Sequence, residues 1–188
     1  MQKHLNDYIK VYKVFDDSTC DMTVELLKSV KWKDHDFLHA DGTYAKRVGD
    51  KELSVSYDIL PTTQTFMTGI YPTIQKYYDE FKFPWFDSWQ GYSQVRWNRY
   101  NENTMMDLHC DNITDLFDGT RRGIPMLSIV GQLNSPDDYT GGEFVMFEDS
   151  KVELQKGEIV IFPSNFLYPH RVQLVNSGTR YSFVSWVW

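Results

Sequence analysis

Short apolar runs of the kind that form strands make up the second half of the chain, from about residue 92 onward. Runs rich in β-branched and aromatic residues occupy positions 92–100, 105–111, 125–134, 142–149, 157–164, 169–175 and 179–188. Polar segments rich in Gly, Asn and Asp separate several of them, at 101–103, 135–142, 155–157 and 176–178. Many short strands separated by turn signals are typical of a β-sandwich or barrel, which we therefore expect here.

The first ninety residues instead show helical periodicity in two places. Ser18 or Thr19 can cap one helix, and residues 62–81 predict a second helix, or a pair of helices broken near Pro72. The expected apolar stripes comprise Met22, Leu26, Leu27 and Val30 in the first case and Phe66, Ile70, Ile74 and Tyr78 in the second. The fold class predicted is mostly β with supporting N-terminal helices (α+β), the helices lying against one sheet.

The chain predicts a single domain over residues 1–188. It contains no internal repeat, low-complexity tract or linker-like segment, and 188 residues suffice to bury one core. Within it, about 1–93 would be helical and strand support, and about 94–188 the β core.

Charge and cysteine content narrow the classes of partner. The net charge of −7 argues against non-specific binding to nucleic acid or to an anionic membrane, and no apolar run is long enough to span a bilayer. The N-terminal segment has no apolar signal-peptide region, and two cysteines are too few for a disulfide framework. We expect a cytoplasmic protein with reduced thiols.

One predicted strand carries two polar residues on the same face. His109 and Asp111 are two positions apart, and residues i and i+2 of a strand point to one side. A buried carboxylate needs a partner or a cation. Among the other histidines, only His170 starts an apolar strand, because His4 is near the terminus and 35–39 reads as an exposed loop or edge. Two histidines and one carboxylate form the facial triad of non-haem Fe(II) oxygenases.

Arg180 follows His170 by ten residues and shares a strand face with Ser182, Val184 and Trp186. A cation at the head of a core strand needs an anion, and the guanidinium fork suits a carboxylate. In a simple hairpin Arg180 would lie about 16 Å along the strand from His170, at about 3.3 Å per residue. If the chain crosses between two packed sheets at 176–178, the separation is roughly 10 Å, which an extended five-carbon diacid spans. The arrangement therefore requires a jelly-roll crossover.

These motifs resemble the Fe(II)/2-oxoglutarate-dependent dioxygenases, and in particular their prolyl 4-hydroxylase-like branch. The resemblance covers about residues 94–188: "VRWNRYNENTMMDLHCD", "LSIVGQLNSPDDYTGGEFVMF" and "KGEIVIFPSNFLYPHRVQLVNSGTRYSFVSWVW". It implies a double-stranded β-helix (jelly roll) that uses Fe(II), 2-oxoglutarate and O2, with ascorbate as reductant. It implies hydroxylation of an unactivated C–H bond of a small-molecule, peptide or protein substrate, with release of succinate and CO2.

The same resemblance assigns roles to individual residues. His109, Asp111 and His170 match the iron ligands, and Arg180 matches the residue that holds the distal carboxylate of 2-oxoglutarate. The remaining matches are Tyr100 and Ser182 near the cosubstrate, Trp186 as a wall of the iron pocket, and Gln132 in place of a cosubstrate-binding tyrosine. The chain departs from the pattern at Asn103, where glycine is usual, and at Met106, where tyrosine is common. With Gln132, and with Arg180 in place of a lysine, these changes weaken the case for peptidyl proline as substrate.

Two other functions remain open at this point. One is a cupin-type metalloenzyme, which usually carries three histidines and a glutamate. The other is a non-catalytic β-sandwich binding module, which would not need a buried arginine ten residues after a buried histidine. In the oxygenase interpretation, the polar segment 112–125 directly follows the metal ligands and is expected to border the substrate entrance.

Overall fold

The computed structural model describes residues 4–38, 43–82, 84, 89–111 and 125–188. Its α-helices are α1 (Asp17–Leu27) and α2 (Thr63–Phe81), and short 3-10 helices span Leu5–Tyr8, Gly49–Lys51 and Pro136–Asp138. The strands of the first half are β1 (Lys10–Lys13), β2 (Lys33–Asp34), β3 (Phe37–Leu38), β4 (Tyr44–Ala45) and β5 (Ser54–Ser56). Those of the second half are β6 (Arg96–Tyr100), β7 (Met106–His109), β8 (Leu127–Gln132), β9 (Tyr139–Gly141), β10 (Phe144–Met146), β11 (Ser150–Lys151), β12 (Glu158–Pro163), β13 (His170–Val172), β14 (Val175–Gly178) and β15 (Arg180–Val187).

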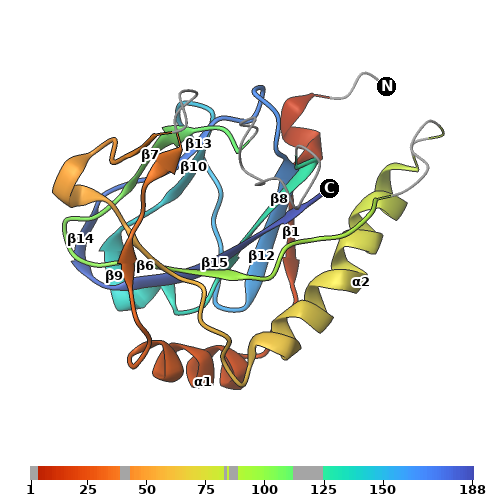
Figure 1. Cartoon of the computed structure of the whole chain (residues 1–188). Coiled ribbons are helices and arrows are strands. Elements are labelled where there is room, and N and C mark those ends of the chain that lie inside the picture. Colours follow the sequence, from red (N-terminus) through yellow and green to blue (C-terminus); the bar gives the residue numbers. More distant parts are fainter. Residues whose placement is uncertain (1–3, 39–42, 83, 85–88, 112–124) are drawn as a thin grey trace.

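Two facing sheets form the body of the molecule (Figure 1). The large sheet has seven strands in the order β1-β12-β8-β15-β6-β5-β2, and the small sheet has four in the order β11-β10-β13-β7. The paired strands of both sheets run antiparallel. This arrangement confirms the predicted fold class, a mostly β jelly roll with supporting helices. It also shows that β1, β2 and β5 of the first half extend the large sheet, which the sequence patterns did not reveal.

Both helices pack on the outer face of the large sheet (Figure 1). The core on that side joins helix residues to outward-facing strand residues: Phe66, Ile70 and Ile74 with Trp97, Ile129, Ile161 and Phe183. The stripe predicted for α2 is confirmed, and α2 is one continuous helix with Pro72 inside it. The helices therefore hold one face of the large sheet and leave its other face to the small sheet.

The start of α1 differs from the prediction. Asp16 is the N-cap, and its carboxylate accepts a hydrogen bond from the backbone N–H of Thr19 at 2.7 Å. The buried positions are Cys20, Thr23 and Leu27, whereas Met22 is exposed. An aspartate placed two residues earlier caps the helix as well as serine or threonine does, so the apolar pattern alone did not locate the cap.

The chain crosses from one sheet to the other between His170 and Arg180, as the spacing of these two residues predicted. Strand β13, which begins at His170, belongs to the small sheet, and β15, which begins at Arg180, belongs to the large one. Residues 176–178 were expected to form a turn. They belong instead to strand β14, which pairs with β9, so two segments expected to be turns hold each other in place. Gly141, Gly142 and Gly178 have positive φ there, which glycine adopts without strain.

The face between the two sheets is the second core and contains the polar residues of interest. It is lined by apolar residues such as Val130, Phe144, Phe162 and Val184. The segment expected to border the substrate entrance lies, from 112 to 124, outside the described residues, as does His39. None of the helices in the described part of the chain is both long and apolar enough to cross a membrane.

Candidate metal centre

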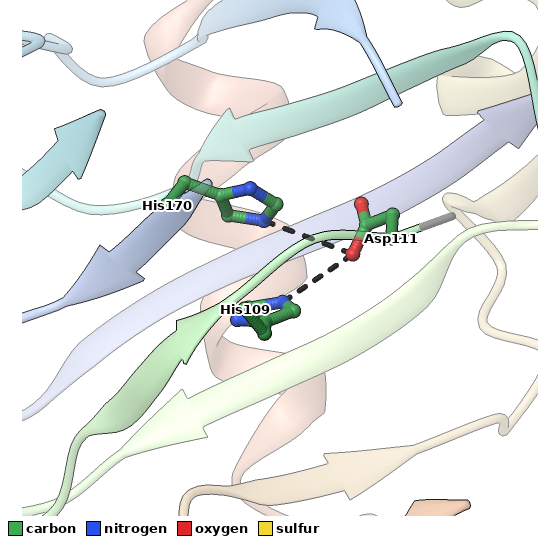
Figure 2. A group of neighbouring side chains, drawn as sticks. All are labelled: His109, Asp111 and His170. Atoms are coloured by element: carbon green, nitrogen blue, oxygen red, sulfur yellow. Dashed lines mark ion pairs between the residues drawn. The ribbon is translucent and has the colours of Figure 1, made fainter. Parts of the chain in front are cut away.

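Three side chains from three chain positions converge between the sheets. His109 ends β7, Asp111 lies two residues after it, and His170 begins the neighbouring strand β13, where it lies opposite His109. Their potential ligand atoms all lie within 4.8 Å of one another. Oδ1 of Asp111 is 3.3 Å from Nε2 of His109 and 3.7 Å from Nε2 of His170, and Figure 2 shows both rings directed at this oxygen.

The hydrogen bonds of the two rings show that Nδ1 of each carries a proton. Nδ1 of His109 lies 2.8 Å from the carbonyl oxygen of Asp107, and Nδ1 of His170 lies 3.2 Å from that of Tyr168. A carbonyl can only accept, so each Nδ1 carries the proton. Burial, reinforced by the nearby His109, lowers the pKa of His170 to about 4, so this ring is neutral at pH 7.

A neutral ring of this tautomer points a lone pair at the carboxylate, which is repulsive unless a cation lies between them. Two imidazoles fixed through Nδ1 and one carboxylate are therefore a donor set that fits a divalent metal ion, and Fe(II) in particular. The second oxygen of the carboxylate is already occupied. Oδ2 of Asp111 accepts hydrogen bonds from Oγ of Ser128 at 2.6 Å and from Nε1 of Trp186 at 2.9 Å.

The charge state of Asp111 agrees with this arrangement. Burial alone would raise the pKa of this carboxyl group, but the neighbouring His170 and His109 and the hydrogen bond from Ser128 outweigh it. The pKa of Asp111 is therefore held well below its usual range, and the group is ionised. Oδ2 is fixed by two donors, so Oδ1 is the oxygen left to meet a cation.

Arg180 is the first residue of β15 and lies on the same inner face of the large sheet as Trp186. It is 1% exposed; one terminal nitrogen donates to Oγ of Ser182 at 3.2 Å, and the guanidinium lies 5.2 Å from the ring centroid of Tyr100. Among the described residues Arg180 has no carboxylate partner. A pocket of about 400 Å³, lined by Gln132, Tyr139 and Phe144 among others, reaches it. A buried guanidinium without an anion beside a pocket is suited to an anionic ligand.

The side chain of Gln132 is engaged differently from what the sequence suggested. Its amide nitrogen lies 3.0 Å from the carbonyl oxygen of Asn134 and 3.1 Å from the hydroxyl of Tyr139. The Tyr139 hydroxyl therefore accepts from Gln132 beside the pocket that Arg180 lines, and sequence reasoning missed this residue. Tyr139 follows a turn-like segment, so no strand pattern marked it.

His35 is not in an exposed loop, which corrects the sequence-based expectation. It is 7% exposed, its ring packs edge-on against Phe37, and Phe37 in turn packs against His109. Its Nδ1 lies 3.8 Å from Oε2 of the buried Glu52. Burial first, and the nearby Arg96 second, lower the pKa of His35 to about 3. The polar residues of 33–38 suggested exposure, but pairing of β2 with β5 brings this segment over the inner face.

Two other residues of the inner face were not foreseen. Ser128 donates a hydrogen bond to Asp111, and the guanidinium of Arg96 lies over the Trp186 ring, 5.1 Å from its centroid. A signal for both is present in the sequence. Ser128 alternates with Val130 and Gln132 in an otherwise apolar run, and Arg96 alternates with Asn98 and Tyr100, so each is a polar position on the buried face of its strand.

Comparison with known proteins identifies the family of the chain. The profile of the 2OG-Fe(II) oxygenase superfamily matches residues 95–188, half of the chain. A PKHD-type hydroxylase of Acinetobacter baumannii is 38% identical over 95 residues, which cover 48% of this chain and 40% of that protein. The chain therefore spans about two fifths of the length of this relative.

Solved structures share the fold at low identity. A viral collagen prolyl hydroxylase of Paramecium bursaria Chlorella virus-1 aligns with a TM-score of 0.68 and 15% identity, covering 96% of this chain and 94% of that one. A prolyl hydroxylase of Trichoplax adhaerens, solved with a peptide of a hypoxia-inducible factor, aligns with a TM-score of 0.68 and 14% identity, covering 98% and 85%. These likenesses confirm the double-stranded β-helix fold. Together with the profile match, which contains all three converging side chains, they show that the chain belongs to the 2OG-Fe(II) oxygenase superfamily.

Proposed function

We propose that this protein is a hydroxylase that uses Fe(II), 2-oxoglutarate and O2, and releases succinate and CO2. The observation that carries the proposal is the convergence of His109, Asp111 and His170, with their ligand atoms within 4.8 Å of one another, on the inner face that also holds Arg180. The family match favours this function over a cupin-type metalloenzyme or a non-catalytic binding module.

In this proposal Nε2 of His109, Nε2 of His170 and Oδ1 of Asp111 hold the iron. When bound, Fe(II) supplies the oxygen chemistry that hydroxylates an unactivated C–H bond. The protein orients the ligands: two backbone carbonyls fix the imidazole tautomers, while Ser128 and Trp186 fix Oδ2 of Asp111. Such outer contacts determine the orientation and basicity of metal ligands.

Arg180 would bind the distal carboxylate of 2-oxoglutarate. Ser182 and Tyr100 would hold the Arg180 guanidinium in position. Oγ of Ser182 accepts a hydrogen bond from it, and the Tyr100 ring lies against it. Gln132 would orient the Tyr139 hydroxyl toward the cosubstrate, because its amide donates a hydrogen bond to that hydroxyl in the pocket that Arg180 lines. Trp186 would form the wall of the iron pocket as well as donating to Asp111.

The proposal extends to the substrate class, the reductant and the extent of the functional unit. A peptide substrate is supported by the Trichoplax adhaerens relative of the same fold, and a small-molecule substrate is equally compatible with the departures from the prolyl hydroxylase pattern. We propose ascorbate as the reductant and a single functional unit over residues 1–188, with about 1–93 as support. The cytoplasmic location and the lack of nucleic-acid or membrane partners stay predictions.

The test is a spectroscopic titration followed by a turnover assay. Fe(II) and then 2-oxoglutarate are added to the purified protein without oxygen, and a visible metal-to-ligand band should develop and saturate at one equivalent of iron per chain. Admitting O2 should bleach the band and yield succinate and CO2 in equal amounts. A protein that binds Fe(II) but forms no band with 2-oxoglutarate would contradict the proposal.

A further inference from the structure

A second buried arginine, Arg96, lies close to the candidate metal centre. Along β6, Arg96, Asn98 and Tyr100 face inward, while Trp97 and Arg99 face the helix side. Arg96 pairs with Val184 of β15, and its guanidinium lies over the ring of Trp186, 5.1 Å from the centroid. Because Trp186 donates to Asp111, only one side chain separates Arg96 from a candidate metal ligand.

The guanidinium of Arg96 is largely unsatisfied. The residue is 9% exposed, and its Nε donates to Oδ1 of Asn98 at 3.1 Å. Its two terminal nitrogens make no hydrogen bond or ion pair with any part of the chain that the structure describes, and neither is fully occluded. A cation that is nine-tenths buried and has two free donors open to a ligand is costly unless an anion meets it.

The nearby carboxylate does not meet this need. Glu52 is buried, but its Oε1 accepts from the backbone N–H groups of Arg47 and Val48, and its Oε2 faces His35 at 3.8 Å. No ion pair of 4.0 Å or less joins it to Arg96. Oδ2 of Asp111 is committed to Ser128 and Trp186, and its Oδ1 faces the two histidines of the candidate metal centre.

Nor does the cosubstrate require Arg96. Arg180 pairs with Tyr100, four residues from Arg96 along β6, which at about 3.3 Å per residue is about 13 Å away. The two negative charges of 2-oxoglutarate are matched by Arg180 and by the single net positive charge of a divalent metal bound to Asp111. Neither group is Arg96, and Arg96 forms no ion pair with Glu52 or any other described carboxylate, so its guanidinium is open to a further anion beside the candidate metal centre.

We propose that Arg96 is a specificity-determining residue that binds a carboxylate of the primary substrate beside the metal centre. The inference rests on the proposed function and deepens it, because it makes the substrate an acid: a free amino acid or other small carboxylic acid, or an acidic side chain within a peptide. The guanidinium lies over the Trp186 ring, and its two terminal nitrogens, which have no partner among the described residues, can donate two parallel hydrogen bonds to a carboxylate. A neutral peptidyl proline would leave this charge unpaired, and such a site discriminates strongly against it.

The experiment compares acids with their carboxamides. Substrate-stimulated succinate formation is screened over the free amino acids and over short peptides that contain Asp or Glu, each against its amide counterpart. Binding of the responding compounds is then measured by calorimetry without oxygen, on protein loaded with Mn(II) and 2-oxoglutarate. Free acids and acidic peptides form separate arms, which identifies the source of the carboxylate.

We expect the acid to bind at least about thirty-fold more tightly than its amide, the lower limit for a buried charge pair. Arg96→Met should abolish that difference, and Arg96→Lys should restore part of it. Arg99→Met is the matched control, because Arg99 lies on the same strand but its guanidinium lies over the Trp32 ring on the helix side of the large sheet. It should behave like the parent, and none of the three variants should change the affinity for 2-oxoglutarate.

Three results would overturn the proposal. The first is an amide, or a neutral proline peptide, that binds as tightly as any acid. The second is an Arg96→Lys protein that has lost 2-oxoglutarate affinity, which would mean that Arg96 serves the cosubstrate. The third is a parent protein that binds no acid although it binds Mn(II) and 2-oxoglutarate. Failure of the parent to bind the metal and 2-oxoglutarate at all would instead contradict the proposed function.

Discussion

The indole Nε1 of Trp186 donates a hydrogen bond of 2.9 Å to Oδ2 of Asp111, across 75 residues of sequence. The contact joins the last strand of the large sheet to the segment that follows β7 of the small sheet. It explains why a tryptophan, rather than another aromatic residue, lies beside the candidate metal ligands. The indole supplies both an apolar wall and the donor that fixes the carboxylate.

Trp186→Phe should therefore weaken metal binding without unfolding the protein. Phenylalanine keeps most of the ring but removes the donor, so Oδ2 of Asp111 retains only Ser128. Loss of such outer contacts lowers metal affinity by about ten- to a hundred-fold. Calorimetric titration of Mn(II) measures the change, and Ser128→Ala should give a loss of the same order. Unchanged affinity in both variants would show that Oδ2 does not need these donors.

His109→Ala and His170→Ala should each abolish metal binding. In the parent, Fe(II) at a hundred times its dissociation constant should raise the free energy of unfolding by about 2.7 kcal/mol, because only the folded chain presents the site. Neither variant should gain this stabilisation in a thermal melt. His35→Gln is the control, since His35 is buried nearby but lies outside the three converging residues. If His35→Gln also loses the effect, the site contains a third histidine.

Arg180→Ala should weaken 2-oxoglutarate binding and leave metal binding nearly unchanged. Removing the guanidinium leaves the distal carboxylate unpaired in a buried pocket, at a cost of roughly 2–5 kcal/mol, or about thirty- to several-thousand-fold in affinity. Arg180→Lys should recover part of the loss, because a point charge replaces the fork. Titrating 2-oxoglutarate into the Fe(II)-loaded protein while recording the visible band measures both. A titration of Arg180→Ala that matches the parent would refute the cosubstrate assignment.

His35 should make the folded state sensitive to acid. Its pKa is about 3 when folded, against 6.5 for an ordinary histidine, so between these values the unfolded chain binds one more proton. The free energy of unfolding then falls as the pH falls through this window, by up to about 1.4 kcal/mol per pH unit. The groups that influence His35 are Arg96, His109, Asp111 and Arg47, with Glu52 opposite its Nδ1.

His35→Gln should remove this contribution, so the stability of the variant should decline less steeply than that of the parent between pH 6 and pH 4. Urea unfolding of the metal-free proteins at several pH values gives the two slopes. Equal slopes would mean that His35 is already protonated in the folded protein. The carboxylate of Glu52 would then pair with the charged imidazole.

Local patterns in the sequence were sufficient for the longer strands of the second half, the two helices and the positions of the candidate ligands, but not for the short strands β9, β11 and β14. A period of two placed His109 and Asp111 on one face, and the ten-residue spacing from His170 to Arg180 required a crossover between sheets, which the strand order confirms. These features depend on residues close together in the sequence, so the sequence alone is enough to predict them. The resemblance added the family, which the profile match confirms.

The tertiary structure decided which residues meet across the strands. Alternation says which face a side chain takes, but not which strand pairs beside it or in which register. The pairing of Trp186 with Ser128 in the large sheet brings both donors to the same oxygen of Asp111, and the pairing of β2 with β5 buries His35. Arg96 lies over Trp186 for the same reason. Long-range register is a sum of many weak contacts over the whole fold, and so no local stretch of sequence contains it.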